Sequence, residues 1–155
     1  MLALVAAGCG GGSTTTETQV VRGAGFRFQT PVGWQIKRAS HVVTAARPKS
    51  DTDLVSVSRF RLPNVPTAGE VDAAAQQLAR MLHGKVTATR VETVAGKPAR
   101  SYEITYERKG QKLELRLVFV LRRLREFQLL CVLAQPAADE TSTACDLLKT
   151  SFRLA

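Results

Sequence analysis

Two cysteines near the end of the sequence are the residues whose type and position most directly indicate chemistry. Cys131 lies within an apolar run, residues 129–133, that predicts a buried strand, and Cys145 lies in the helical stretch that we expect to cover it. Outside the cytoplasm such a pair is normally oxidised, so we predict a Cys131–Cys145 disulfide that stabilises the fold by about 3 kcal/mol. The alternative is two buried thiols that never meet. A metal site is not expected, because no cluster of histidine or cysteine accompanies the pair.

The third cysteine, Cys9, ends a run of small and apolar residues that reads M-L-A-L-V-A-A-G-C. This run resembles the lipobox of bacterial lipoproteins, in which small residues precede a cysteine that is acylated through its sulfur. The resemblance implies that residues 1–8 are the remnant of a signal peptide and that Cys9 is lipidated, with palmitate among its acyl chains. The run departs from the lipobox pattern at Ala6, where leucine is commoner. It also lacks a basic segment before the apolar residues, so we expect that the native start lies upstream or that the chain was trimmed.

The segment after Cys9 reads G-G-G-S-T-T-T-E-T-Q and contains no large apolar residue. That composition predicts a flexible polar tether, and we assign residues 9–24 to the lipidated cysteine and its linker. The apolar run is far shorter than the about 20 residues that span a bilayer, whereas two acyl chains are enough for stable anchoring. We therefore expect a lipid anchor on the extracytoplasmic face of the cell membrane and a folded domain over residues 25–155. An apolar N-terminus with an incidental cysteine is the alternative.

The charge of the chain is strongly basic, at +9 from 22 Lys and Arg against 13 Asp and Glu. Such an excess favours polyanions or an anionic membrane surface as neighbours. Arg122, Arg123 and Arg125 are the preferred contact with an anionic surface, because three charges within four residues cannot all turn away from it. A solvated basic surface is the alternative. Nucleic acid is not expected as a partner, because aromatic residues make up only 6% of the chain and no stacking platform is visible.

Residues that could support catalysis do not form a recognisable motif. The sequence contains no G-x-S-x-G, H-E-x-x-H, P-loop or G-x-G-x-x-G pattern. His41 and His83 have no carboxylate or nucleophile close in sequence, and His83 suits the negative end of a helix dipole. Glu103 and Glu107 share the polar face of one predicted strand, where we expect Lys or Arg of a neighbouring strand, such as Arg116, to pair with them. We therefore assign no catalytic residue, no cofactor and no metal ligand.

Alternation of apolar and polar residues predicts that most of the chain forms strands. The expected strands cover residues 26–28, 34–36, 41–46, 53–62, 86–94, 102–106, 113–121 and 127–134, and a last short strand covers residues 151–154. Lys109-Gly110 is the expected turn between two of these strands. Residues 129–133 are apolar on both faces of their strand, so we expect further layers to cover the sheet on both sides.

Two helices are expected to provide that cover. The first extends from Thr67 to His83; it begins with the capping-box pattern Thr67-x-x-Glu70, and Gly84 stands where a C′ glycine ends a helix. Its apolar residues form one stripe, which consists of Val71, Ala74, Ala75, Leu78 and Leu82. The second begins at Pro136 and extends to about Leu148. These elements predict an α+β fold, a three-layer α/β/α sandwich with a mainly antiparallel sheet and two main helices.

Three stretches of the sequence resemble PsbP-like domains, the group that includes the LpqN/LpqT-type lipoproteins of actinobacteria. They are Phe26-Arg-Phe28-x-x-Pro31-x-Gly33-Trp34 near the start, Gly96-Lys97-Pro98-Ala99, and Leu147-Leu148-Lys149-Thr150-Ser151-Phe152-Arg153 at the end. The resemblance covers about residues 25–155 and rests on structural rather than catalytic motifs. It implies an α/β/α sandwich with a role in binding or assembly, and it leaves the partner open.

The leading functional hypothesis is a non-enzymatic binding or scaffold module at the cell envelope, whose partner is the membrane, an unknown envelope protein or an anionic surface. A carrier of a small apolar ligand is the first alternative, and it requires an enclosed apolar pocket of several hundred cubic ångströms between sheet and helix. A hydrolase is the second alternative. It requires His41 or His83 beside a carboxylate and a hydroxyl group in a cleft.

Overall fold

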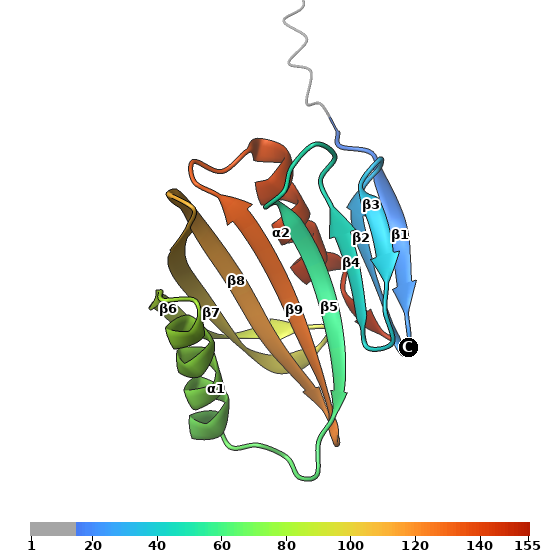
Figure 1. Cartoon of the computed structure of the whole chain (residues 1–155). Coiled ribbons are helices and arrows are strands. Elements are labelled where there is room, and N and C mark those ends of the chain that lie inside the picture. The colour runs from blue at the N-terminus through green and yellow to red at the C-terminus, as the bar shows by residue number, and fades with distance from the viewer. Residues whose placement is uncertain (1–14) are drawn as a thin grey trace, which may run out of the picture.

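The structure is a computed structural model that describes residues 15–155 (Figure 1). Cys9, residues 1–8 and the start of the expected linker lie outside the described residues. The elements of the described part are, in order, β1 (Thr18–Gly23), β2 (Phe26–Pro31), β3 (Gln35–Arg38), β4 (Val42–Ala46), β5 (Leu54–Arg61), α1 (Ala68–Met81), β6 (Lys85–Val94), β7 (Lys97–Arg108), β8 (Gln111–Arg122), β9 (Arg125–Ala134), α2 (Asp139–Ser151) and β10 (Arg153–Leu154).

Seven strands form one large sheet in the order β3-β4-β5-β9-β8-β7-β6, and each neighbouring pair is antiparallel. Strands β6 to β9 are a meander. Lys109 and Gly110 form the expected turn between β7 and β8 with φ values of 51° and 77°, which the left-handed region of a tight hairpin turn requires. The turn before β8 and the turn after it therefore lie at opposite ends of the sheet.

The remaining three strands form a second sheet in the order β1-β2-β10. Strand β1 pairs with β2 from Thr18 opposite Pro31 to Gly23 opposite Phe26. The assignment of residues 9–24 to a linker is therefore wrong for residues 18–23, and the folded domain begins before Gly25. Only Val21 of this strand is fully buried. The strand therefore has no alternating apolar pattern in the sequence, and its pairing with β2 defines it.

The large sheet is covered on both faces, as expected (Figure 1). Helix α1 packs on β6 and β7, and α2 together with β2 covers the other face. Between the two sheets, the rings of Phe26, Phe127 and Phe152 lie with their centroids 5.8 to 6.1 Å apart. Because alternate residues of β8 and β9 face opposite sides, the continuous apolar runs of these strands supply both cores. The three-layer α+β sandwich with two main helices is confirmed, with the small sheet as part of one outer layer.

The predicted capping box of α1 is present: the Glu70 amide donates to the Thr67 hydroxyl oxygen at 3.2 Å and the Thr67 amide donates to the Glu70 carboxylate at 2.7 Å. The helix itself ends at Met81 rather than at His83. His83, not Gly84, has the left-handed conformation, with a φ of 54°. The amide of Gly84 donates to the Ala79 carbonyl group at 2.8 Å, which completes a Schellman motif.

Helix α2 begins at Asp139, three positions after the proline that was expected to open it. Pro136 lies in the connection from β9, and Ala138 is extended at φ −71° and ψ 141°, so the helical conformation starts only after it. The helix continues to Ser151, beyond the expected end near Leu148, and leaves only Arg153 and Leu154 for β10. No helix of the described residues is long and apolar enough to span a membrane.

Candidate functional site

The two late cysteines are joined, as the sequence predicts. Cys131 on β9 and Cys145 on α2 form a disulfide with a Cα–Cα distance of 5.6 Å. Both residues are buried, at 2% and 6% exposure. The bond therefore fixes α2 to the centre of the large sheet and closes a loop with a sequence separation of 14 residues.

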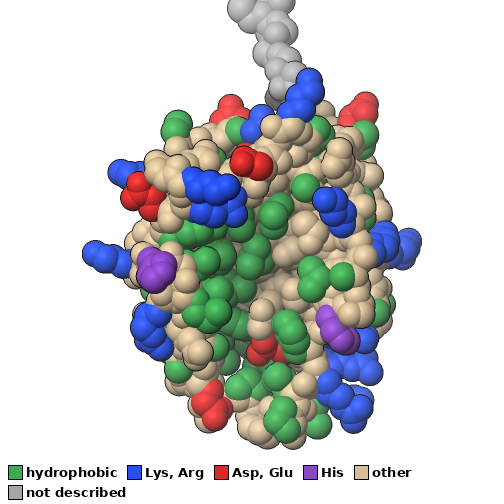
Figure 2. Space-filling model, in the orientation of Figure 1, with side chains coloured by type: hydrophobic (Ala, Val, Ile, Leu, Met, Phe, Trp, Pro, Cys, Tyr) green, Lys and Arg blue, Asp and Glu red, His purple; other side chains and the backbone are tan. Residues whose placement is uncertain are grey.

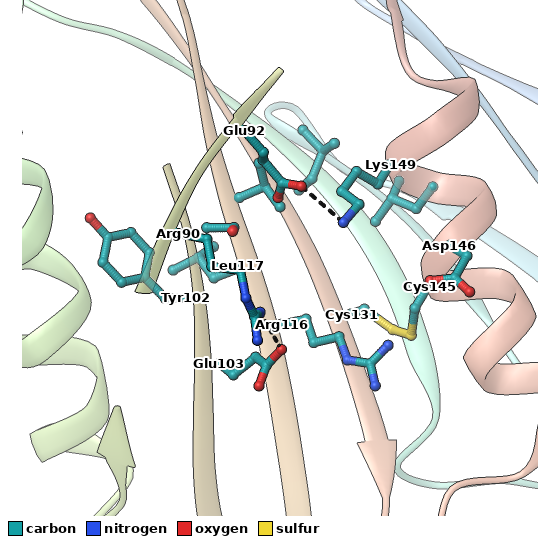
Figure 3. Close-up of a pocket in the computed structure, with 14 residues that line it drawn as sticks. Arg90, Glu92, Tyr102, Glu103, Arg116, Leu117, Cys131, Cys145, Asp146 and Lys149 are labelled. Atoms are coloured by element: carbon teal, nitrogen blue, oxygen red, sulfur yellow. Dashed lines mark hydrogen bonds and ion pairs between the residues drawn. A yellow bond between two sulfur atoms is a disulfide. The ribbon is translucent and has the colours of Figure 1, made fainter. Parts of the chain in front are cut away.

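A small cavity lies beside this disulfide, between α2 and strands β6 to β8 (Figure 3). Its lining combines the disulfide and the apolar side chains of Leu117, Val118 and Leu129 with several charged side chains. The charges neutralise one another: Arg90 pairs with Glu103 at 2.6 Å, and Lys149 pairs with Glu92 at 3.0 Å. Its volume of about 110 Å³ is well below the roughly 300 Å³ or more of a pocket for a drug-sized ligand. This cavity does not provide the carrier pocket that the alternative hypothesis requires.

The two glutamates of β7 take different positions. Glu103 lies directly opposite Arg116 of β8, but its carboxylate pairs with Arg90 on the other neighbouring strand, β6. Arg116 pairs instead with Glu114 at 2.6 Å along its own strand. Glu107 lies opposite Lys112 near the turn and is exposed. The expectation that a basic residue of a neighbouring strand pairs with Glu103 is confirmed, with Arg90 rather than Arg116 as the residue.

The histidines lie in separate clefts. His41 lines a cleft of about 250 Å³ together with Arg22, Arg38 and Arg59, and no carboxylate contributes to it. His83 and Glu107 line another cleft, of about 440 Å³. The side chains of His83 and Glu107 are both exposed, and within residues 15–155 no hydrogen bond joins His83 to Glu107. The described residues also contain no group of three potential metal ligands.

A buried polar network that the sequence does not reveal holds the start of α2. The Asp53 carboxylate, at 4% exposure, accepts hydrogen bonds from the Thr141 hydroxyl group at 2.6 Å and from the Ala134 amide at 3.0 Å. Burial opposes its ionisation, but these bonds, with those from Thr52 and Arg47, outweigh that effect and lower the pKa of Asp53. The network has a structural role, because its donors bind the Asp53 carboxylate within the fold and none of them is left free for a ligand.

A second cluster anchors α1 to the sheet. Arg100 of β7 binds both carboxylate oxygens of Asp72, at 2.8 and 3.0 Å, and the Tyr102 hydroxyl group also donates to Asp72. The hydrogen bonds from Tyr102 and Arg100 lower the pKa of Asp72. The pKa of Tyr102 is raised, first by burial and then by its bond to the carboxylate. Bidentate pairing of this kind fixes geometry, so the cluster determines where α1 lies.

The predicted basic contact is placed at one end of the large sheet. Arg122, Arg123 and Arg125 surround the turn between β8 and β9, and all three are exposed. Arg108, Lys109 and Lys112 surround the turn at the opposite end of β8. Residues 15–17 also lie at that opposite end (Figure 1). The Glu17 carbonyl group accepts a hydrogen bond of 2.9 Å from the amide of Val32, which lies just before β3 at this end of the large sheet.

Six further arginines gather around the same turn, although they come from distant parts of the sequence. Hydrogen bonds link the segments: Arg59 donates to the Ala24 carbonyl group at 3.2 Å, and Arg122 donates to the main-chain oxygen of Ala155 at 2.9 Å. We call this surface the arginine pole; it consists of Arg22, Arg27, Arg38, Arg59, Arg61, Arg122, Arg123, Arg125 and Arg153. No spacing in the sequence indicates it, because tertiary pairing assembles it from five segments.

Solved structures of other proteins resemble the fold of this chain. No protein family and no curated protein matches the sequence. The solved structure of cyanobacterial PsbP (CyanoP) from Synechocystis sp. PCC 6803 is 15% identical, and the match covers 96% of this chain and 98% of that one with a TM-score of 0.67. A structure from Bacteroides thetaiotaomicron is 11% identical, and the match covers 90% of this chain and 48% of that one with a TM-score of 0.62.

A third solved structure is that of LpqN from Mycobacterium tuberculosis, a protein involved in cell envelope biogenesis. It is 14% identical, and the match covers 90% of this chain and 91% of that one with a TM-score of 0.52. Identities this low show the fold alone. The strand order, the two helices and these likenesses agree with the resemblance in sequence, and the chain therefore has the PsbP-like fold that CyanoP and LpqN share.

Proposed function

We propose that the chain is a lipoprotein, anchored at Cys9 on the extracytoplasmic face of the cell membrane, whose domain is a non-enzymatic binding or scaffold module of the cell envelope. The disulfide between Cys131 and Cys145 carries this proposal. Such bonds persist in oxidising compartments and are rare in the cytosol. The description of LpqN as a protein of cell envelope biogenesis supports the same compartment.

The arrangement of charged groups supports a role without catalysis. A general base needs a proton donor or nucleophile within hydrogen-bond reach, whereas the carboxylates of Asp53, Asp72 and Glu103 are engaged by basic or hydroxyl groups of the fold. Each of these residues holds two elements together. Substitution of these residues would lower the stability of the domain rather than remove a chemical step.

The anchor is tested by metabolic labelling with an alkyne analogue of palmitate in cells that express the gene from its native start. We expect label on the wild-type protein and none on Cys9→Ala. The double variant Cys131→Ala/Cys145→Ala is the matched control, because it removes thiols without touching the proposed acylation site, and it should label as the wild type does. Equal labelling of Cys9→Ala and the wild type would contradict the anchor.

The absence of catalysis is tested with the pair of residues that comes nearest to a catalytic arrangement. His83 and Glu107 line one cleft, so His83→Ala and Glu107→Gln are compared with the wild type on a panel of ester, amide and phosphate substrates. We expect no turnover above the buffer rate in any of the three proteins. Turnover by the wild type that either substitution abolishes would replace the binding module with a hydrolase.

A further inference from the structure

The arginine pole carries a charge that the described fold does not neutralise. The ion pairs with Asp or Glu side chains among residues 15–155 involve Arg47, Arg90, Arg100, Arg116 and Lys149, and none of these pairs includes an arginine of the pole. Eight of the nine side chains are exposed, and Arg59 is half-buried. An arginine side chain has five N–H donors. The few hydrogen bonds to main-chain carbonyl groups therefore leave most donors of the pole free for a ligand.

The arginines of the pole are also aligned across the strands. In the small sheet, Arg27 lies directly opposite Arg22 on one side and Arg153 on the other. In the large sheet, Arg125 lies directly opposite Arg61 on one side and Arg122 on the other. Like charges at directly opposite positions destabilise a sheet. Two such rows at one end of the molecule are unfavourable for the sheets. Natural proteins keep unfavourable local arrangements of this kind mainly at functional sites.

The two rows lie at the same end of the molecule but point in different directions. Arg27 alternates with Phe26 and Phe28, which pack toward the large sheet, so the row of the small sheet points away from the large sheet. Arg61, Arg122 and Arg125 occupy the face of the large sheet that also bears Val57, Val120 and Phe127, so they point toward the side where the small sheet lies. The Arg122 side chain donates to the main-chain oxygen of Ala155, and the Ala155 amide donates to the Gly25 carbonyl group at 2.9 Å. The Arg59 side chain donates to the Ala24 carbonyl group, so this end of the large sheet is tied to the turn between β1 and β2. Figure 2 shows basic side chains projecting from this end of the molecule.

Exposed apolar side chains lie next to these charges. Leu124 stands at the tip of the turn between Arg123 and Arg125 and is 42% exposed. The Leu124 carbonyl group accepts a hydrogen bond from the Leu62 amide at 2.8 Å, so the end of β5 with the 40% exposed Phe60 lies beside it. A soluble polyanion gains nothing from such side chains. The interface of a bilayer rewards them, because phosphate headgroups bind the guanidinium groups and the acyl boundary accepts the apolar groups.

We propose that the arginine pole docks on an anionic lipid bilayer, with Arg61, Arg122 and Arg125 on headgroup phosphates and with Leu124 inserted at the tip. Docking is independent of acylation at Cys9. It is also compatible with the proposed anchor. Nine residue steps separate Cys9 from Thr18 and can span about 30 Å, whereas β1 covers about 17 Å from Thr18 to the pole, so both contacts can reach the same membrane.

Vesicle binding of the full chain with Cys9→Ser, which cannot be acylated there, tests the proposal. We expect it to bind vesicles of phosphatidylcholine mixed with phosphatidylglycerol and not vesicles of phosphatidylcholine alone. Each basic residue near an anionic surface strengthens binding about fivefold, so Arg61→Gln/Arg122→Gln/Arg125→Gln should weaken it about a hundredfold. Binding should also fall as salt shortens the Debye length from about 10 Å at 0.1 M to about 3 Å at 1 M.

The matched control is Arg108→Gln/Lys109→Gln/Lys112→Gln, which removes the same charge from the opposite end of β8. We expect it to bind within about threefold of the parent chain, because those residues stay more than a Debye length from the docked surface. Equal weakening by the two triple variants would show attraction to net charge alone and would overturn the proposal. Thermal melting of each variant confirms that it is folded.

The role of Leu124 separates a bilayer from a soluble anionic polymer. Leu124→Ser should weaken vesicle binding about tenfold, because a leucine side chain leaves water on insertion. Met81→Ser, which alters a 70% exposed methionine where α1 ends, at the end of the sheet away from the pole, should change nothing. In Leu124→Trp, brominated acyl chains should quench the added fluorescence. An unchanged affinity of Leu124→Ser, together with equally tight binding of the parent chain to polyphosphate, would assign the pole to a polymer and overturn the proposal.

Discussion

The Asp53 carboxylate at the start of β5 accepts a hydrogen bond of 2.6 Å from the Thr141 hydroxyl group in the first turn of α2. The two residues are 88 positions apart in the sequence. The N-cap residue of α2, Ala138, has no side chain that can cap the helix. Asp53 places a negative charge near the positive end of this helix from outside it, which is a stabilising position for a carboxylate.

We expect Asp53→Asn to lower the free energy of unfolding by about 1–3 kcal/mol at neutral pH, because it removes charge-assisted hydrogen bonds from a buried site. The pKa of Asp53 is lowered in the folded protein from its ordinary value of 3.8. Its contribution to stability is therefore complete above that value and is lost as the pH falls through the lower folded pKa. Urea unfolding at several pH values should show the variant and the wild type converging at acid pH, whereas Asp51→Asn at the exposed neighbour should match the wild type throughout.

Loss of the disulfide should destabilise the domain without unfolding it at room temperature. Closing a loop of this length contributes about 3 kcal/mol, which is less than the about 5–15 kcal/mol of an ordinary domain. We expect Cys131→Ala/Cys145→Ala and the reduced wild type to lose similar amounts of stability in denaturant titrations. Free, alkylatable thiols at both positions in protein purified from its native compartment would contradict the bond itself.

The end of α1 offers a pair of neighbouring substitutions with opposite signs. His83 has a φ of 54°, where glycine avoids the steric cost of a side chain, so His83→Gly should stabilise the protein by up to about 1 kcal/mol. A Cβ atom on Gly84 would overlap the carbonyl group of Thr105, so Gly84→Ala should destabilise it. Thermal melts of the two variants decide this. Stabilisation by Gly84→Ala would show that α1 can move away from β7.

Relief of repulsion in the small sheet should raise stability. Arg27 faces arginines on both sides, Arg22 and Arg153, and a directly opposed pair of like charges costs about 0.2–1 kcal/mol. We expect Arg27→Gln to be more stable than the wild type at low salt and equal to it at high salt. Arg80→Gln, at an exposed position of α1 outside the pole, should show no gain at either salt concentration.

Interactions between residues close in the chain were predictable from the sequence. The capping box at Thr67 and Glu70 and the turn at Lys109-Gly110 each depend on neighbours within a few positions, and both are present. The apolar stripe of α1 is present except at Ala74, which is exposed, and Ala79 is buried in addition. The two apolar faces of β9 also indicated both outer layers. The disulfide was predictable to the same extent, because a buried strand and the helix that covers it bring Cys131 and Cys145 together.

Contacts between residues far apart in the chain were decided only by the tertiary structure. Strand β1 was not predicted, because its two valines, Val20 and Val21, are adjacent rather than alternating and only its pairing with β2 defines it. The partner of Glu103 depended on which of its two neighbouring strands placed a basic side chain within reach of the carboxylate. The network of Asp53 joins the start of β5 to α2, which is far away in the sequence. The arginine pole has the same origin. Strands pair according to the topology of the fold, whatever charges they bear. The order of strands in the two sheets, and not a run of basic residues in the sequence, therefore places nine arginines at one end of the molecule.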